Sequence, residues 1–266
     1  MNKLYISADI EGVSGIVDWK ETDNGDFQSA YFRAQMTREV KAACEAASEA
    51  GVTDILVKDA HGSGRSIDPS ALPRNACILR SWTRDPLVMM GGFDSSFEGV
   101  FFIGYHSMAG SGGNPLSHTM DLNVQELRIN GKPVSEFVIN AYTAASMGVP
   151  VMLLTGDREL CDSAREYNPN LVTVPVSEGI GSGSVSIHPD LAAERIKAAA
   201  ASALSGDPET FRFPLPDSFD VSIVYKQHYR AYRASYYPGA RLASPSEVNF
   251  RSGTWEDVLT FFLFVL

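Results

Sequence analysis

Short apolar runs alternate with helix-like segments through the first 157 residues, and this alternation restricts the possible folds more than any other feature. Four runs, residues 3–10, 52–61, 99–107 and 149–157, are rich in β-branched and aromatic residues and predict strands. Helical patterns cover residues 27–50, which stop at Gly51, and residues 135–147. Strands that alternate with helices predict an α/β protein with a mainly parallel sheet flanked by helices.

The pattern changes after Pro214, where short strand-like runs follow one another before a final helix. We therefore expect a single unit over residues 1–266, with two possible lobes. An α/β lobe would cover residues 1–157, and a smaller C-terminal lobe would cover residues 158–266. Asn130-Gly131 predicts a tight hairpin turn. The closing run VLTFFLFVL is too short to span a bilayer, so it predicts a core helix or an oligomer contact.

The overall charge argues against one class of partner. The 266 residues carry 32 Asp and Glu against 22 Lys and Arg, a formal net charge of −10. Sustained nucleic-acid binding needs a basic face, so no nucleic-acid partner is expected. No secretory signal pattern or membrane-spanning run is visible, and no membrane partner is expected either.

The cysteines predict the compartment. There are three, at positions 44, 77 and 161, in no CxxC arrangement. A sparse, odd set is typical of reduced thiols in a cytoplasmic protein rather than of a disulfide framework. Cys44 lies in a helical pattern and Cys77 in an apparent strand, so both are expected to be small buried hydrophobic residues.

Polar side chains collect where the predicted strands end. Asp9 and Glu11 follow the first strand, His61 follows the second and His106 the third. Residues two apart point to the same side, so the two carboxylates would face one point and repel each other. A divalent cation removes that penalty. Because ligands bind at the carboxyl ends of parallel strands, two imidazoles arriving there complete a ligand set suited to zinc or a similar metal.

Each of these residues also has a simpler interpretation when it is taken alone. An Asp at a strand end, such as Asp9 or Asp59, commonly caps a turn, and a His after an apolar run is commonly structural. Glu136 lies in the first turn of a predicted helix, where the helix dipole favours an acid without any ligand role. His118 lies in a loop; near a metal it could act as an acid, a base or an oxyanion donor.

Five motifs, in this order and spacing, resemble the D-aminopeptidase family of zinc metallopeptidases (peptidase family M55). They are SADIEGVSG (7–15), KDAHGSG (58–64), GYHSMAG (104–110), LSHTM (116–120) and INGKPVSEFVINAY (129–142). The resemblance extends from residue 4 to about residue 157, and more loosely beyond. The sequence departs from the family pattern in the loop 107–116 and in the tail after about residue 180, which concerns substrate preference and assembly.

The resemblance implies a centre of two Zn²⁺ ions per chain. Asp9 would bridge the metals; Glu11 and His61 would complete one site, and His106 and Glu136 the other. His118 would be the catalytic histidine. The resemblance also implies a small peptide substrate with an N-terminal D-residue such as D-alanine, and a ring-like homo-oligomer, a decamer. The mixed tyrosines and arginines of residues 228–241 would then belong to a subunit contact or a substrate channel.

Two alternatives remain at this point. In a haloacid-dehalogenase-like phosphatase, Asp9 would be a nucleophile and magnesium ligand, and TGDRELCD (Asp157, Asp162) would supply a late acidic motif. Against it, the second acid is Glu11 rather than Asp, and the histidines would have no role. The other alternative is a non-catalytic metal-binding or peptide-binding protein, which would not need His118.

Overall fold

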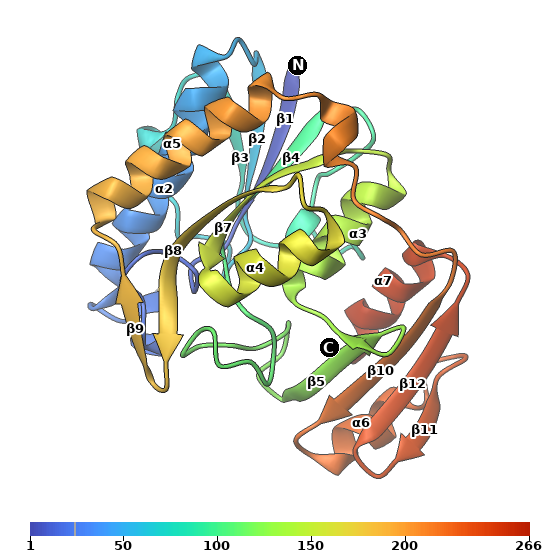
Figure 1. Cartoon of the computed structure of the whole chain (residues 1–266). Coiled ribbons are helices and arrows are strands. Elements are labelled where there is room, and N and C mark those ends of the chain that lie inside the picture. Colours follow the sequence, from blue (N-terminus) through green and yellow to red (C-terminus); the bar gives the residue numbers. More distant parts are fainter. Residues whose placement is uncertain (24) are drawn as a thin grey trace.

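Two β-sheets organise the chain, a larger mainly parallel sheet and a smaller antiparallel one (Figure 1). The protein is represented by a computed structural model that describes residues 1–23 and 25–266. The larger sheet, sheet A, contains in spatial order β3 (Ala76–Leu79), β2 (Asp54–Asp59), β1 (Lys3–Ala8), β4 (Gly99–Tyr105), β7 (Val151–Asp157), β8 (Val172–Ile180) and β9 (Gly183–Ser186). The smaller sheet, sheet B, contains β11 (Arg241–Ser244), β12 (Glu247–Ser252), β10 (Phe219–Tyr225), β5 (Val124–Ile129) and β6 (Lys132–Pro133).

The helices are distributed over both sheets. They are α1 (Trp19–Thr22), α2 (Ser29–Glu49), α3 (Glu136–Ser146), α4 (Arg158–Tyr167), α5 (Pro189–Ser205), α6 (His228–Ala234) and α7 (Trp255–Val265), with the 3₁₀ turns η1 (Pro69–Ala71), η2 (Val88–Met90) and η3 (Pro208–Phe211). The predicted α/β class is confirmed. The predicted helices over residues 27–50 and 135–147 correspond to α2 and α3, each within two residues at either end.

The strand order of sheet A places a crevice beside β1. From β1 the chain runs to β2 and β3 on one side, and then β4 pairs with the other side of β1; all these pairings are parallel. In such sheets, ligands bind outside the carboxyl ends of the strands at the point where the order reverses. The carboxyl ends of β1, β2 and β4 therefore meet at the position where a binding site is expected.

Two hydrophobic layers cover the two faces of sheet A. Alternate residues of β1 point to opposite faces, so Leu4 and Ile6 join a cluster with α2 and α5, whereas Tyr5 joins the cluster on the side of α3 and α4. Figure 1 shows α2 and α5 together on one side and α3 with α4 on the other. Burial on both faces explains why these strands are almost continuously apolar.

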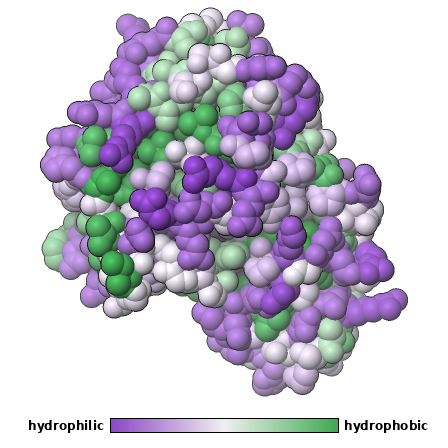
Figure 2. All heavy atoms as spheres, in the orientation of Figure 1, coloured by the Kyte–Doolittle hydropathy of each residue, from purple (hydrophilic) through white to green (hydrophobic). Residues whose placement is uncertain are grey.

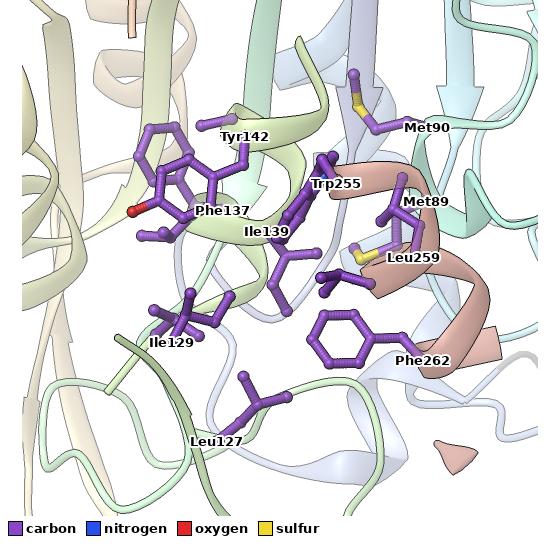
Figure 3. Close-up of a cluster of buried hydrophobic side chains, with 14 of the residues drawn as sticks. Met89, Met90, Leu127, Ile129, Phe137, Ile139, Tyr142, Trp255, Leu259 and Phe262 are labelled. Carbon is purple, nitrogen blue, oxygen red and sulfur yellow. The ribbon is translucent and has the colours of Figure 1, made fainter. Parts of the chain in front are cut away.

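The second cluster also joins the two sheets (Figure 3). Phe137 and Tyr142 of α3 pack with Trp255 and Leu259 of α7 and with Leu127 of β5. Sheet B takes β5 and β6 from before residue 157, while sheet A takes β8 and β9 from after it. Residue 157 therefore does not separate the two sheets.

Two local predictions have clear outcomes. Asn130 and Gly131 have φ values of 52° and 77° and join β5 to the antiparallel β6, so the predicted tight hairpin is confirmed. The prediction that Cys77 is buried is wrong: it lies in a strand, but β3 is the edge of sheet A and the side chain is exposed. Cys44 is buried, as predicted.

The surface carries exposed hydrophobic residues at both ends of the molecule. Ile180 and Val185 are 66% and 63% exposed on the β8–β9 hairpin, where Figure 2 shows hydrophobic atoms at the left edge of the molecule. Near sheet B, Tyr236 of the segment after α6 and Phe264 of α7 are 72% and 66% exposed. Across residues 1–23 and 25–266, we find no helix with the length and apolar character needed to cross a membrane.

Candidate metal centre

The loop after β1 brings Asp9 and Glu11 to the crevice. This loop lies directly against β4, because Gly12 N donates a hydrogen bond to Gly104 O at 2.9 Å. A Cβ atom on Gly12 would lie 1.7 Å from Tyr105 O, so only glycine allows this close approach. The glycine after the acidic pair therefore fixes the direction in which both carboxylates leave the strand.

His61 approaches these two carboxylates from the loop after β2. Its Nδ1 lies 3.3 Å from Asp9 Oδ1 and 3.0 Å from Glu11 Oε2. Because β1 and β2 are parallel neighbours, residues that follow them lie at the same edge of the sheet. The structure thus brings together the first group of residues that the sequence predicted.

His106 and Glu136 approach Asp9 from the other side. His106 Nε2, after β4, lies 3.5 Å from Asp9 Oδ2 and 3.5 Å from Glu136 Oε2. Glu136 is the first residue of α3, whose N-terminus is capped by the Ser135 side chain. The other ring nitrogen of His106, Nδ1, lies 2.9 Å from Ser107 O, so a proton on Nδ1 is held by that carbonyl. Nε2 then faces the carboxylates, and it offers a lone pair to a metal when it is not protonated.

The side chains form three overlapping groups of donors, in each of which the ligand atoms lie within 4.8 Å of one another. They are Asp9–Glu11–His61, Asp9–His106–Glu136 and Glu11–His106–His118. The three carboxylates are almost fully buried: Asp9 and Glu11 are 2% exposed and Glu136 is 3% exposed. Three buried acids at one point need compensating positive charge.

Two buried atoms of this cluster lack hydrogen-bond partners. Glu11 Oε2 and His106 Nε2 make no hydrogen bond of regular geometry with a described residue, although ion-pair partners lie 3.0 Å and 3.5 Å away. A buried polar atom without a partner is costly, and both atoms are ligand types that transition metals bind. The donor set therefore fits a divalent metal.

The protonation equilibria show how the cluster balances its charge without a cation. Burial and the neighbouring charge of Glu11 raise the pKa of Asp9 well above its usual value. Burial would lower the pKa of both imidazoles, but the carboxylates outweigh it: the pKa of His61 is raised well above 6.5 and that of His106 to about 10. Glu11 is also buried, yet the charge of His61 holds its pKa well below normal. Protons thus occupy the imidazoles, and a bound metal would displace them.

His118 lies beside the cluster on the loop that follows β4. Its ring stacks on that of His106, with centroids 4.4 Å apart and planes at 10°. Nδ1 lies 3.0 Å from Leu116 O, and Nε2 lies 3.4 Å from Glu136 Oε1. Trp19 contacts the ring edge-on at 5.3 Å. The carbonyl of Leu116 and the two aromatic neighbours fix the ring, while its Nε2 faces the cluster.

Comparison with known proteins places the chain in a family. The model of peptidase family M55, described as D-aminopeptidase, matches residues 2–264. A D-aminopeptidase of Bacillus subtilis (strain 168) is 32% identical over 241 residues, which cover 90% of this chain and 87% of the relative. The chain belongs to the M55 D-aminopeptidase family. A solved structure described as the Zn-dependent D-aminopeptidase DppA from Bacillus subtilis, a self-compartmentalizing protease, superposes with a TM-score of 0.91 at 30% identity, covering 99% of this chain and 96% of that one.

Membership of the M55 family confirms the resemblance seen in the sequence and the predicted enzyme class. The phosphatase alternative is not supported. Both acids of its late motif, Asp157 and Asp162, have structural roles in this M55 protein. Asp157 accepts from Leu160 N at 2.9 Å and so caps α4. Asp162 is half exposed and pairs with Arg165 at 2.7 Å. Neither belongs to any of the donor groups found among the described residues.

Asp157 has a second contact that reaches the cluster indirectly. It accepts hydrogen bonds from Ser107 N at 2.6 Å and from Ser107 Oγ at 2.5 Å. Ser107 O in turn lies against His106 Nδ1. The buried carboxylate therefore holds the peptide that orients one of the candidate ligands, which is a common arrangement around metal-binding histidines.

Asp59 braces the loop that carries His61. Its Oδ2 accepts from Ser66 N at 2.6 Å and from Ile67 N at 2.8 Å, which closes the loop after β2. From the sequence, an Asp at a strand end such as Asp59 commonly caps a turn. The hydrogen bonds are those of a loop cap, and they position His61 through the backbone.

A cleft of about 490 Å³ opens beside the metal-binding cluster. The sequence predicted the polar side of this cleft but none of its other lining residues: Trp19, Trp82, Arg84, Val88, Met89, Met120, Leu122, Phe262, Leu263 and Leu266. These residues come from four separate parts of the chain, namely the start of α1, the segment 82–89 with η2, the loop 120–122 and the end of α7, and no periodic pattern identifies them. Met120 also donates its backbone N–H to Glu136 Oε1 at 2.6 Å, from a left-handed conformation with φ 65°.

Proposed function

We propose that this M55 protein is a zinc-dependent aminopeptidase that removes an N-terminal D-amino acid, such as D-alanine, from short peptides. Membership of the D-aminopeptidase family and the likeness to a Zn-dependent relative support this activity. The observation that carries the proposal is the position of Asp9, which is shared by two separate histidine–carboxylate groups. A shared carboxylate of this kind suits a pair of metal ions.

Two Zn²⁺ per chain are proposed, with Asp9 between them. Its two oxygens face different histidines: Oδ1 lies 3.3 Å from His61 and Oδ2 lies 3.5 Å from His106. Glu11 would complete the site with His61, and Glu136 the site with His106. When bound, a zinc pair supplies a nucleophilic water at neutral pH and polarises the scissile carbonyl.

His118 is proposed as the catalytic histidine. Because Leu116 O holds the proton on Nδ1, Nε2 is the atom that faces the reaction. A protonated Nε2 can donate to the oxygen that becomes negative when the scissile carbonyl is attacked, or pass its proton to the leaving amine. Its stacking on His106 keeps it next to the cluster without making it a member of the two groups that share Asp9.

A panel of dipeptides that differ only in the chirality of the first residue tests the activity. Purified protein of measured metal content is incubated with D-Ala-D-Ala and L-Ala-D-Ala, and free alanine is followed. We expect about two zinc ions per chain and faster release from the peptide with the D-residue. Zinc bound without hydrolysis of either peptide would favour a binding protein, and magnesium-dependent hydrolysis of phosphate esters would favour the phosphatase.

A homo-oligomer is also proposed, and a ring-like decamer in particular. The DppA relative is self-compartmentalizing. Two exposed hydrophobic surfaces of this chain are suited to subunit contacts: the β8–β9 hairpin with Ile180 and Val185, and the end of the molecule formed by Tyr236 and Phe264. Three free cysteines are consistent with the proposed cytoplasmic location.

A further inference from the structure

The cleft beside the metal-binding cluster has an uneven distribution of charge. On one side lie the acidic residues Asp9, Glu11 and Glu136, and much of the remaining wall is apolar. Arg84 is the only lysine or arginine among the described residues that line it. A volume of about 490 Å³ is in the range of small-molecule sites, which suits a short peptide rather than a protein chain.

The guanidinium of Arg84 has no partner among the residues that the structure describes. Within residues 1–23 and 25–266, it forms no hydrogen bond or ion pair. The adjacent carboxylate, Asp85, instead accepts from Leu87 N at 2.9 Å. In a protein with a net charge of −10, this exposed cation at the cleft therefore stays available to an anion from solution.

The loop that carries Arg84 is held firmly by the end of β2. Lys58, fully buried, donates from Nζ to Ser81 O at 2.9 Å and lies 4.3 Å from the centre of the Trp82 ring. Trp82 Nε1 donates to Gly62 O at 2.8 Å. These contacts tie the loop to the same segment that positions His61.

The backbone of this loop is strained. Ser81, Arg84 and Val88 have φ values of 65°, 66° and 47°, a region that non-glycine residues seldom adopt and that is least favourable for a β-branched valine. Strain of this kind persists only where the surrounding structure holds the chain, and it clusters at binding sites. Arg84 is thus presented to the cleft by a loop of fixed shape.

We infer that Arg84 binds the α-carboxylate of the substrate, so that the preferred substrates are di- and tripeptides with a free C-terminus. This inference rests on the proposed aminopeptidase function. The metal-binding cluster receives the N-terminal end and the scissile bond, and the only other charge of such a peptide is its terminal carboxylate. A guanidinium recognises a carboxylate through two parallel N–H···O bonds, and these charge-assisted bonds are stronger than neutral ones.

The test compares free-acid and amide forms of one peptide, D-Ala-D-Ala and D-Ala-D-Ala amide, in the wild type and in Arg84→Gly. Glycine is the suitable replacement because it adopts positive φ without strain, so the loop keeps its shape. For the free acid we expect kcat/KM to fall about 10- to 100-fold, mainly through a higher KM. For the amide we expect a change of less than about 3-fold, and Arg84→Lys should retain part of the preference for the acid.

Two control variants separate recognition from loop structure. Arg80→Ala removes the same charge from the same segment, but Arg80 lines a different depression, with Ile67 and Asp68. Ser81→Gly relieves the same kind of backbone strain without removing a charge. Neither should change the ratio of acid to amide turnover.

The outcomes distinguish this inference from the proposed function. Equal losses on the acid and the amide in Arg84→Gly would overturn the carboxylate role and leave the aminopeptidase intact. An unchanged acid-to-amide ratio with unchanged rates would also overturn it. If the wild-type protein of full zinc content hydrolysed neither peptide, the proposed function itself would fail.

Discussion

The carboxyl edge of sheet A buries charged side chains, whereas the outer surface around sheet B exposes aromatic ones. At the edge of sheet A, Asp9, Glu11 and His106 are buried close together; burial and Glu11 raise the pKa of Asp9, and the surrounding carboxylates raise the pKa of His106 against the effect of burial. Around sheet B, Tyr236 and Phe264 stand out from the surface. Buried charge without full compensation is suited to binding a cation, whereas exposed apolar surface is suited to binding another chain.

The largest effect at the edge of sheet A is expected from Asp9, the residue shared by both donor groups that contain it. Asp9→Ala should lower zinc content well below one per chain and reduce kcat/KM for D-Ala-D-Ala by more than about 1,000-fold, because neither group stays complete. Metal analysis and steady-state kinetics on the same preparation measure this. Retention of two zinc ions would mean that Asp9 does not bridge them.

His118→Ala should have the next largest effect, but on turnover alone. Loss of a general acid or oxyanion donor lowers kcat by about 100- to 10,000-fold, while the groups that contain Asp9 remain intact. Zinc content close to that of the wild type, together with low kcat, would support the assignment. Low zinc content in this variant would instead make His118 a ligand, in keeping with its place in the group Glu11–His106–His118.

Asp157 should have a smaller effect, because it acts on His106 only through Ser107. Asp157→Ala removes the acceptor for two hydrogen bonds from Ser107 and should reduce zinc affinity about 10- to 100-fold. Asp157→Asn keeps one acceptor oxygen, so it should restore part of the affinity. Zinc titration against a competing chelator measures both variants, and equal losses in the two would indicate that the residue only stabilises the fold.

Most residues at the carboxyl edge of sheet A could be predicted from the sequence, because each directly follows a strand that its own apolar pattern identifies. Asp9, His61 and His106 each follow an apolar run, so a parallel sheet brings them together without further information. Glu136 was assigned through the family resemblance alone, because an acid at the start of a helix needs no ligand role. The need for glycine after the acidic pair is visible only in the structure, where Gly12 lies against the backbone of Tyr105.

Sheet B and the far wall of the cleft could not be predicted in this way. Leu127 of β5 pairs with Ile223 of β10, and no local periodicity encodes a pairing over such a distance in the chain. The exposure of Cys77 follows from the position of β3 at the edge of sheet A, which depends on the order of all the strands. Arg84 owes its place to a left-handed backbone that tertiary contacts impose.

Lys58, which holds the loop of Trp82 and Arg84, should make the stability of the protein depend on pH. Burial lowers the pKa of Lys58 to about 8, although the charge of Asp59 opposes this. Between pH 8 and about 10.4, its value in an unfolded chain, the folded protein has lost the proton that the unfolded chain still holds, so Lys58 adds stability as the pH rises. The difference in Tm between the wild type and Lys58→Met should therefore shift by a few °C in favour of the wild type over this interval. Thermal unfolding at pH 7.5 and 10 measures the shift, and a constant difference would mean that Lys58 keeps an ordinary pKa.

The smallest effect on catalysis is expected at the exposed surfaces. Variants there show whether the subunit contact lies beside sheet B or at the hairpin of sheet A. Phe264→Asp and Val185→Asp each place a charge on an exposed apolar side chain, the first on α7 beside sheet B and the second on β9 of sheet A. We expect Phe264→Asp to shift the protein to smaller species in light scattering, because Phe264 packs against Tyr237, which follows the exposed Tyr232 and Tyr236 along the chain. Zinc content should stay unchanged, since neither residue belongs to the donor groups. If only Val185→Asp dissociated the oligomer, the subunit contact would lie at the β8–β9 hairpin. Sheet A would then carry both the metal-binding cluster and the subunit contact.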